Sequence, residues 1–304
     1  MENTEFGAVP GASPAGASAP APVPSPTSVK AAPGSGVLTV ISLGAGVQSS
    51  ALALMAAHGL IKPMPDCAIF ADTRSEPDAV YEWLAWLEAS LPFPVYRVSA
   101  GSLRGQILDG MAGIGRIDGR PPFFVAPGGM LNRQCTSDFE IDPIQRKVGE
   151  LIGHKPGSRW PLSAVVEQWI GISTDEVQRA KPSRLSAIRH RFPLVEAGFS
   201  RSDCLAWFDS LLIPRPPRSA CTFCPYHDDA YWRDLKRNDF ESFAGAVLID
   251  EAIRPGIGGG GEWFVHRSRT PLASVDFRTA EEAGQLAMFD EEGFAVECEG
   301  MCGV

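Results

Sequence analysis

A regular alternation of short apolar runs with helix-forming segments constrains this sequence more than any other feature. The run 37–42 is apolar and β-branched, which predicts a buried strand. A turn rich in glycine and serine follows at 43–50, and a helix-forming run over 51–58 then ends at Gly59. Because strand and helix alternate again over 66–99, the sequence predicts an α/β fold with a parallel, doubly wound sheet.

The later segments repeat the same pattern. The run 66–71 is predicted as a second strand, 76–90 as an amphipathic helix and 95–99 as a third strand. Ser102 is placed to cap the helix that comes next. A further apolar, strand-like run occupies 168–172.

The turn after the first strand has the features of an anion-binding site. A strand–turn–helix unit directs backbone N–H groups and the positive end of the helix dipole toward a bound anion. The hydroxyl groups of Ser42, Ser49 and Ser50 add donors at the same place. The alternative is a tight connection between strand and helix that binds no ligand.

Two more groups of polar residues follow predicted strands. Asp72 and Thr73 come directly after the second strand, where Asp72 can accept a hydrogen bond from a ribose hydroxyl or an adenine amine. Its alternative role is to cap the next helix. Asp175 and Glu176 follow the strand-like run 168–172, with Arg179 close behind. We interpret Glu176 as a Mg²⁺ ligand and Arg179 as a phosphate partner, the alternative being a helix start with an internal ion pair.

Seven cysteines give the chain a second chemical theme. Cys221 and Cys224 form a Cys-x-x-Cys-Pro motif that can bind one side of a metal centre, and so requires partners. Cys135, in a polar stretch, is the best third ligand, and Cys298 and Cys302 supply further candidates near the C-terminus.

The other two cysteines receive a different interpretation. Cys67 lies within a predicted buried strand and is expected in the core. Cys204 lies near a predicted helix start, where a thiolate would be stabilised by the helix dipole, but a small core residue on an amphipathic helix is favoured.

Together these motifs resemble a known group of proteins. Ser42-x-Gly44-x-Gly46-x-x-Ser49-Ser50, followed by Phe70-Ala-Asp-Thr73, resembles the adenine nucleotide α-hydrolase-like superfamily of PP-loop ATP pyrophosphatases. Within it, the sequence is most similar to the phosphoadenosine-phosphosulfate reductase family. The stretches 133–143, 169–179 and 218–226 resemble later motifs of that family. Leu43 and Gln48 depart from the usual Ser-Gly-Gly-x-Asp-Ser loop.

The resemblance implies a Rossmann-like fold, an adenine nucleotide and a set of site residues. ATP or phosphoadenosine phosphosulfate would be held by Ser42, Gly44, Gly46, Gln48, Ser49, Ser50, Asp72 and Thr73, with Asp175, Glu176 and Arg179 as catalytic residues and Mg²⁺ on the phosphates. The resemblance and the proline after Cys224 also imply a 4Fe–4S cluster. A four-cysteine zinc site and a metal-free, redox-active cysteine pair are the alternatives.

The function that follows is an ATP-pyrophosphatase-type enzyme that adenylates a substrate and couples this step to sulfur transfer or redox chemistry. One alternative is a sulfonucleotide reductase. Another is a non-catalytic module that binds nucleotide and cluster within a nucleic-acid modification or defence assembly.

Composition divides the chain and limits its partners. Residues 1–36 are rich in alanine, proline and serine and predict a disordered tail, followed by a nucleotide-binding domain over 37–195 and a smaller, mostly helical region with the cysteines over 196–304. The tail has neither signal-peptide nor transit-peptide features, and no apolar run is long enough to span a membrane, so a cytoplasmic protein is expected.

Charge is distributed unevenly along the sequence. The net charge of −9 argues against general nucleic-acid binding, but residues 178–218 carry eight basic and three acidic side chains. That stretch is a candidate contact for tRNA or DNA phosphates, and the alternative is a solvated basic face.

Overall fold

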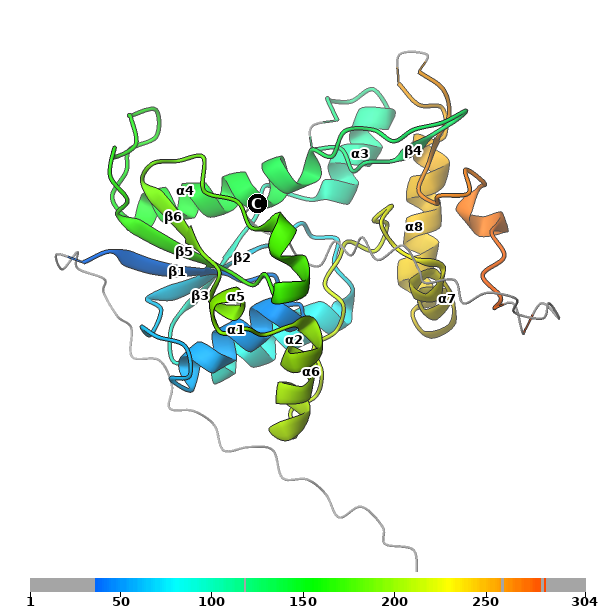
Figure 1. Ribbon diagram of the computed structural model, residues 1–304. Helices are drawn as coiled ribbons and strands as arrows, with labels where there is room; N and C mark the ends of the chain where they lie inside the picture. The colour runs from blue at the N-terminus through cyan, green and yellow to red at the C-terminus, as the bar shows by residue number, and fades with distance from the viewer. Residues whose placement is uncertain (1–35, 118, 258–259, 280–281, 283–304) are drawn as a thin grey trace, which may run out of the picture.

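A five-stranded parallel sheet forms the centre of the molecule. The structure is a computed structural model that describes residues 36–117, 119–257, 260–279 and 282 (Figure 1). The strands follow the order β3-β2-β1-β5-β6, and each neighbouring pair is parallel. They are β1 (Leu38–Ser42), β2 (Cys67–Ala71), β3 (Val95–Val98), β5 (Val166–Ile170) and β6 (Ile188–Arg191). This arrangement confirms the predicted α/β class, and the direction of winding reverses between β1 and β5.

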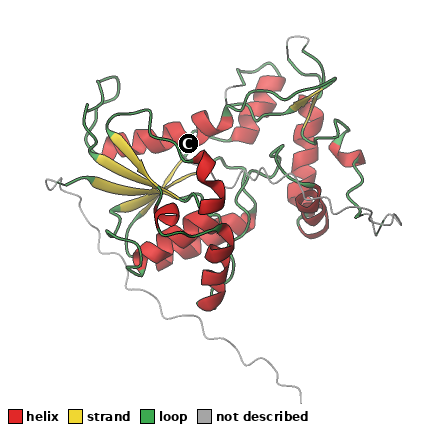
Figure 2. Cartoon of the chain, viewed as in Figure 1, coloured by secondary structure: helices red, strands yellow, loops and turns green. Residues whose placement is uncertain are grey.

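Helices cover both faces of the sheet (Figure 2). On one face α1 (Val47–Ala57) and α2 (Asp78–Ser90) pack in one apolar cluster with alternate strand residues such as Ile41 and Phe70. On the other face α4 (Asp142–Leu151) packs against the remaining strand residues. Two covered faces explain why the central strands β1, β2 and β5 are buried along almost their whole length.

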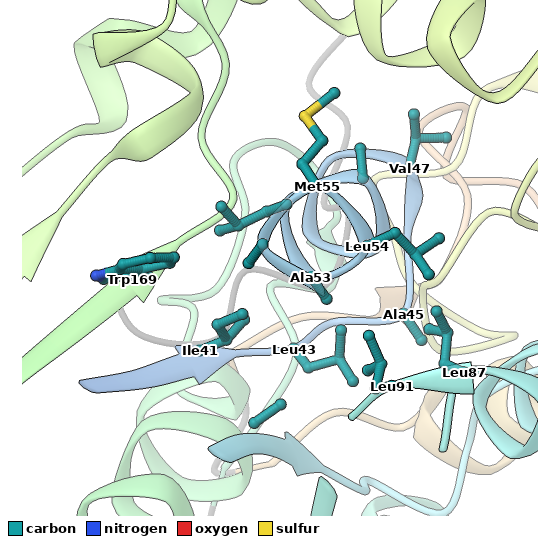
Figure 3. Close-up of a cluster of buried hydrophobic side chains, with 14 of the residues drawn as sticks. Ile41, Leu43, Ala45, Val47, Ala53, Leu54, Met55, Leu87, Leu91 and Trp169 are labelled. Atoms are coloured by element: carbon teal, nitrogen blue, oxygen red, sulfur yellow. The ribbon is translucent and has the colours of Figure 1, made fainter. Parts of the chain in front are cut away.

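Figure 3 shows the first of these clusters. Ala53, Leu54 and Met55 of α1 lie above Ile41 and Leu43 of β1 and its loop, and all five are buried. This packing fixes α1 over the carboxyl end of β1.

Element boundaries differ from the sequence expectation where a glycine or proline sets the start. Helix α1 begins at Val47 rather than 51, because Gly46 is its N-cap in extended conformation. Helix α2 begins at Asp78 because Pro77 precedes it as N-cap. The predicted cap Ser102 is confirmed, since its side chain accepts a hydrogen bond from the backbone of Gly105.

A second apolar core lies beside the sheet and combines distant segments. It joins α3 (Leu103–Met111) with α7 (Asp229–Asn238) and α8 (Phe240–Ile253). The short strand β4 (Phe124–Val125) pairs antiparallel with β7 (Trp263–Phe264) in the same region. The remaining elements are η1 (Thr136–Ile141), η2 (Thr174–Arg179), α5 (Pro193–Glu196), α6 (Arg201–Ser210) and η3 (Leu272–Ser274).

The predicted domain boundary at residue 195 does not coincide with the division between the two apolar cores. Helix α6 lies beyond that position but packs on α1, through Cys204 and Phe208. Helix α3 lies well before it but packs against α8. Residues 1–35, Cys298 and Cys302 lie outside the described residues. Among the described helices, none combines the length and the hydropathy that crossing a membrane requires.

Candidate functional site

The candidate nucleotide site lies at the carboxyl end of β1, beside the point where the sheet reverses its winding. Ala45 in the loop has a φ of 58°, the left-handed conformation that glycine usually supplies. The N-terminus of α1 receives no side-chain cap, and its first turn has no acidic residue. The positive end of this helix is therefore compatible with an anion.

Gly171 allows the end of β5 to lie directly against this helix start. A Cβ atom at Gly171 would be 2.8 Å from both the N and Cα atoms of Ser49, closer than van der Waals contact allows. No other residue type fits without moving the backbone. The loop after β1 and the loop after β5 therefore lie together at the reversal point.

The three serine hydroxyls predicted to face a phosphate also accept hydrogen bonds within the protein. Ser49 Oγ accepts a hydrogen bond from the Gly44 N–H at 3.1 Å. Ser42 Oγ accepts from Gln168, and Ser50 Oγ accepts from the indole N–H of Trp83 at 2.9 Å. The backbone N–H groups of the first turn of α1 are further donors suited to a phosphate.

Gln48 connects the loop to the charged residues after β5. Its amide nitrogen donates to Glu176 Oε2 at 3.1 Å and to Ser173 Oγ at 3.3 Å, and its amide oxygen accepts from Arg201 at 3.1 Å. Arg179 donates to the other oxygen of Glu176. Burial raises the pKa of Glu176, against the opposing effect of Arg179. The two arginines and the glutamate thus form one network at the amino end of α1.

The structure gives the two predicted aspartates local partners. Asp175 accepts from the backbone N–H of Arg201 at 3.1 Å and so connects η2 to α6. Burial opposes ionisation of Asp175, but hydrogen bonds from Ser173 and from backbone N–H groups lower its pKa overall. Asp72 accepts from the Arg74 N–H at 2.7 Å and the Tyr81 hydroxyl at 2.9 Å, which stabilises the turn after β2.

Thr73 joins the nucleotide side of the sheet to the cysteines. Its hydroxyl lies 3.2 Å from Cys221 Sγ. Two further hydrogen bonds support the contact: the Thr222 N–H donates to Ser75 O at 2.8 Å, and Ser219 Oγ donates to Glu76 at 3.1 Å. The segment after β2 therefore touches the Cys-x-x-Cys loop directly.

Three cysteines from distant parts of the sequence line one small cavity. Cys135, Cys221 and Cys224 border a space of about 30 Å³, together with the carboxylates Glu76 and Glu140. Burial and then the charge of Glu76 raise the pKa of the Cys221 thiol well above its usual value. As arranged, no three metal-binding side chains of the described residues can share one ion.

The surroundings of these thiols fit a bound group in chemistry. Thr136 follows Cys135, and its hydroxyl is buried with no hydrogen-bond partner among the described residues. The Tyr231 hydroxyl is buried in the same way. Burial raises the pKa of Tyr231, and the charges of Glu76, Cys224 and Cys221 contribute. Thiols with unpaired hydroxyls in their vicinity have the chemistry of a cluster site, whose sulfides accept hydrogen bonds. Neither hydroxyl lines the cavity, and a cluster needs more space than the cavity offers.

The other two cysteines of the described residues are in the core. Cys67 in β2 and Cys204 in α6 are buried, and burial raises the pKa of each thiol to about 12. Neither lines the cavity of the other three.

Sequence reasoning missed several residues that complete these sites. Arg201 belongs to the basic stretch, but only the folded chain brings it to Gln48. Gly171 follows a predicted strand, but its close approach to α1 has no counterpart in the sequence. No sequence feature predicts that Glu76 and Glu140 lie beside the thiols.

Comparisons with known proteins give distant structural similarity. No protein-family model matches the sequence, and no curated protein matches it. A phosphoadenylyl-sulfate (PAPS) reductase from Candida auris, in a phosphate complex, has a TM-score of 0.38 and 14% identity, covering 59% of this chain and 75% of the other. The U34-tRNA thiolase NcsA from Methanococcus maripaludis, with its 4Fe-4S cluster, has a TM-score of 0.33 and 11% identity, covering 70% of each chain.

The bracing role of Ser49 predicts a specific loss on substitution. Ser49→Ala removes the acceptor of the Gly44 N–H, so the loop should lose its fixed shape and ATP should bind about fivefold more weakly, equivalent to about 1 kcal/mol. Titration calorimetry measures this change. Ser50→Ala is the matched comparison: it should lower the thermal midpoint, because the Trp83 N–H loses its acceptor, while ATP affinity stays the same. Equal affinities of Ser49→Ala and the wild type would contradict the assignment of the loop.

His227 supports the cysteine loop and predicts a pH dependence. Its Nε2 lies 2.8 Å from Cys221 O, and burial together with the charge of Arg218 lowers its pKa from 6.5 to about 3. Below pH 6.5 the unfolded chain binds a proton at His227 that the folded chain does not. The contribution of His227 to the free energy of unfolding should therefore decrease as the pH is lowered below 6.5, by up to about 1.4 kcal/mol per pH unit.

Denaturant titrations between pH 7 and pH 4.5 check this expectation. His227→Gln should show a shallower decline of unfolding free energy with falling pH than the wild type. Tyr231→Phe keeps the ring that stacks on His227 and should retain the wild-type slope. Parallel curves for His227→Gln and the wild type would show that His227 is not the group responsible.

Proposed function

We propose that this chain is an adenine-nucleotide-dependent enzyme of ATP-pyrophosphatase type that couples substrate activation to sulfur or redox chemistry at its cysteines. The contact between Thr73 and Cys221, at 3.2 Å, carries the proposal, because it places the segment after β2, which the sequence assigns to the nucleotide, against the Cys-x-x-Cys loop. Neither site alone distinguishes an enzyme from a binding module.

Three features support nucleotide binding at the reversal point of the sheet. Open parallel sheets bind ligands outside the carboxyl ends of their strands at this point. The first turn of α1 offers backbone N–H groups there, without a competing cap. Arg179 and Arg201 bring positive charge to the same network. The proposed ligand is therefore a phosphate-bearing nucleotide such as ATP.

The chemistry proposed for this site is adenylation. A substrate oxygen attacks the α-phosphorus, and pyrophosphate leaves with the bonding electrons. The helix N–H groups and the two arginines would stabilise the charge that develops on the phosphate oxygens. Glu176 would hold Mg²⁺, which would neutralise phosphate charge when bound. Gln48, which occupies the position where similar loops commonly have an aspartate, would fix the position of Glu176 through its hydrogen bond.

Cys135, Cys221 and Cys224 would hold the group that performs the second half-reaction. A 4Fe–4S cluster, when bound, would supply sulfur or electrons. Cys298 and Cys302 are proposed as further ligands and lie outside the described residues. Thr136 and Tyr231 would donate hydrogen bonds toward this group.

We also propose a tRNA or DNA acceptor, although fewer basic side chains are available for it than the sequence suggested. Of the eight basic side chains in 178–218, five form ion pairs with carboxylates: Arg179, Arg189, Arg191, Arg215 and Arg218. These pairs reduce the positive charge available to nucleic-acid phosphates.

Product analysis with two labelled nucleotides tests the proposal. Pyrophosphate released from ATP in the presence of Mg²⁺ supports the pyrophosphatase type. Sulfite released from phosphoadenosine phosphosulfate would establish a reductase instead, and binding without turnover of either would indicate a non-catalytic module. Glu176→Gln should lower ATP turnover at least tenfold, about 1.4 kcal/mol in the barrier, with little change in thermal midpoint. A large loss of stability with unchanged turnover would assign Glu176 a structural role.

Metal content provides an independent prediction. Protein purified without oxygen should be brown, with broad absorbance at about 400 nm and about four iron atoms per chain. Cys221→Ala should abolish iron binding and destabilise the cysteine region, since ligand binding and folding share free energy. Cys67→Ala, a substitution in the core strand, should keep the iron. Colourless protein with about one zinc per chain would exclude the cluster.

A further inference from the structure

A second cavity lies on the surface of the second core, away from the nucleotide loop and the thiol cavity. Its volume is about 400 Å³, within the range of small-molecule sites. It shares no lining residue with the thiol cavity. It lies between the start of α7 and the segment 266–276. The side chains on its wall are mostly polar: Asp229, His266, Arg267, Ser268, Thr270, Ser274 and Asp276, with Val275.

A chain of hydrogen bonds crosses one wall of this cavity. His266 Nε2 lies 2.9 Å from Asp229 Oδ1, and His266 Nδ1 lies 2.8 Å from Ser268 Oγ. The imidazole is 3% exposed, whereas Ser268 is exposed at the cavity. A serine, a histidine and an aspartate are thus connected in series.

The backbone determines where the imidazole proton lies. The Ser268 N–H points at His266 Nδ1 from 3.2 Å, and an N–H group can only donate. His266 Nδ1 must therefore be an acceptor, so the ring proton lies on Nε2 and is donated to Asp229. The Ser268 hydroxyl then donates its own proton to Nδ1. This is the proton arrangement that a serine nucleophile and its base require.

Surrounding contacts hold the histidine in place. The ring of Phe277 packs edge-on against His266, with centroids 5.5 Å apart. Asp229 lies in the first turn of α7 and also accepts from Arg267 at 2.9 Å. The hydrogen bond from His266 is the largest influence lowering the pKa of Asp229, so this carboxylate stays ionised. Arg267 brings positive charge to the cavity wall.

We propose that Ser268 is a nucleophile toward small carboxylic esters that enter this cavity, with His266 as its general base and Asp229 as a positioning residue. The size of the cavity selects a small acyl group over a long one. The proposal is independent of the nucleotide site, because it uses none of its residues.

The reaction balances with water as the only co-reactant. Ser268 Oγ forms a bond to the ester carbonyl carbon while its proton moves to His266 Nδ1. The bond from that carbon to the alcohol oxygen then breaks, and the departing alcohol takes the proton from Nδ1. Water, deprotonated by the same nitrogen, then attacks the acyl carbon. The bond from that carbon to Ser268 Oγ breaks, Oγ takes the proton back from Nδ1, and the carboxylic acid is released. Arg267 stabilises the negative charge of both tetrahedral intermediates.

Labelling of the full chain with an alkyl fluorophosphonate tests the proposal. The probe phosphonylates activated serines and releases fluoride. Intact-mass and peptide analysis should find one added phosphonyl group, on Ser268, and Ser268→Ala should remain unlabelled. Ser274 is an exposed serine on the same cavity wall, so Ser274→Ala should label like the wild type. The absence of label on Ser268 would overturn the proposal.

Two further variants separate a catalytic relay from a structural turn. His266→Gln, with folding verified by its thermal midpoint, should label at least about a hundredfold more slowly, the contribution typical of a general base. Asp229→Asn should lower the maximal labelling rate while the half-saturating probe concentration stays the same. A folded His266→Gln protein that labels at the wild-type rate would refute the relay. If His266→Gln does not fold, the comparison of wild type with Ser268→Ala decides the question. Hydrolysis of p-nitrophenyl acetate should follow the same order.

Discussion

The close approach of Gly171 to the first turn of α1 is the constraint on which the candidate nucleotide site depends. With no side chain at Gly171, the end of β5 lies against the backbone of Ser49. That contact brings Ser173 and Glu176 within reach of Gln48, whose amide then orders both. The apolar packing of α1 on the sheet holds the other side of the junction. At the point where the strand order reverses, a network of charged side chains therefore lies beside the N-terminus of α1. The positive end of a helix dipole is a favourable place for an anion.

The segment after β2 has the corresponding role between the two cores. Thr73 and Ser75 contact the Cys-x-x-Cys loop, and the Leu103 N–H donates to Thr73 O at the start of α3. Helix α3 in turn packs against α8. Movement at the end of β2 would therefore reach both the thiols and the second core. This connectivity links the segment after β2 to the cysteines and to the second core, and it is the physical basis of the proposed function.

The sequence predicted the types of residue at the site better than their contacts. It assigned Gln48 to the nucleotide and Glu176 and Arg179 to catalysis, and in the structure Glu176 contacts both other residues. It also paired Cys135 with the Cys-x-x-Cys motif, and all three cysteines line one cavity. The serine hydroxyls also accept hydrogen bonds from Gly44, Trp83 and Gln168, which residue type alone could not show. The identities of the nucleotide, the metal and the acceptor are predictions, because contacts within the chain do not determine which ligand binds.

The sequence by itself determined the α/β class and the positions of β1, β2 and β3, because apolar runs and glycine or proline breaks are local properties of the chain. It gave no sign of β6, whose Ile-Arg-His-Arg sequence is mostly polar. Tertiary structure alone decided which loops meet. Arg201 reaches Gln48 across 153 positions, and Ser268, His266 and Asp229 align only when α7 packs beside the segment 266–276. Such contacts depend on the packing of two cores, and packing between segments far apart in the chain leaves no periodic pattern in the sequence.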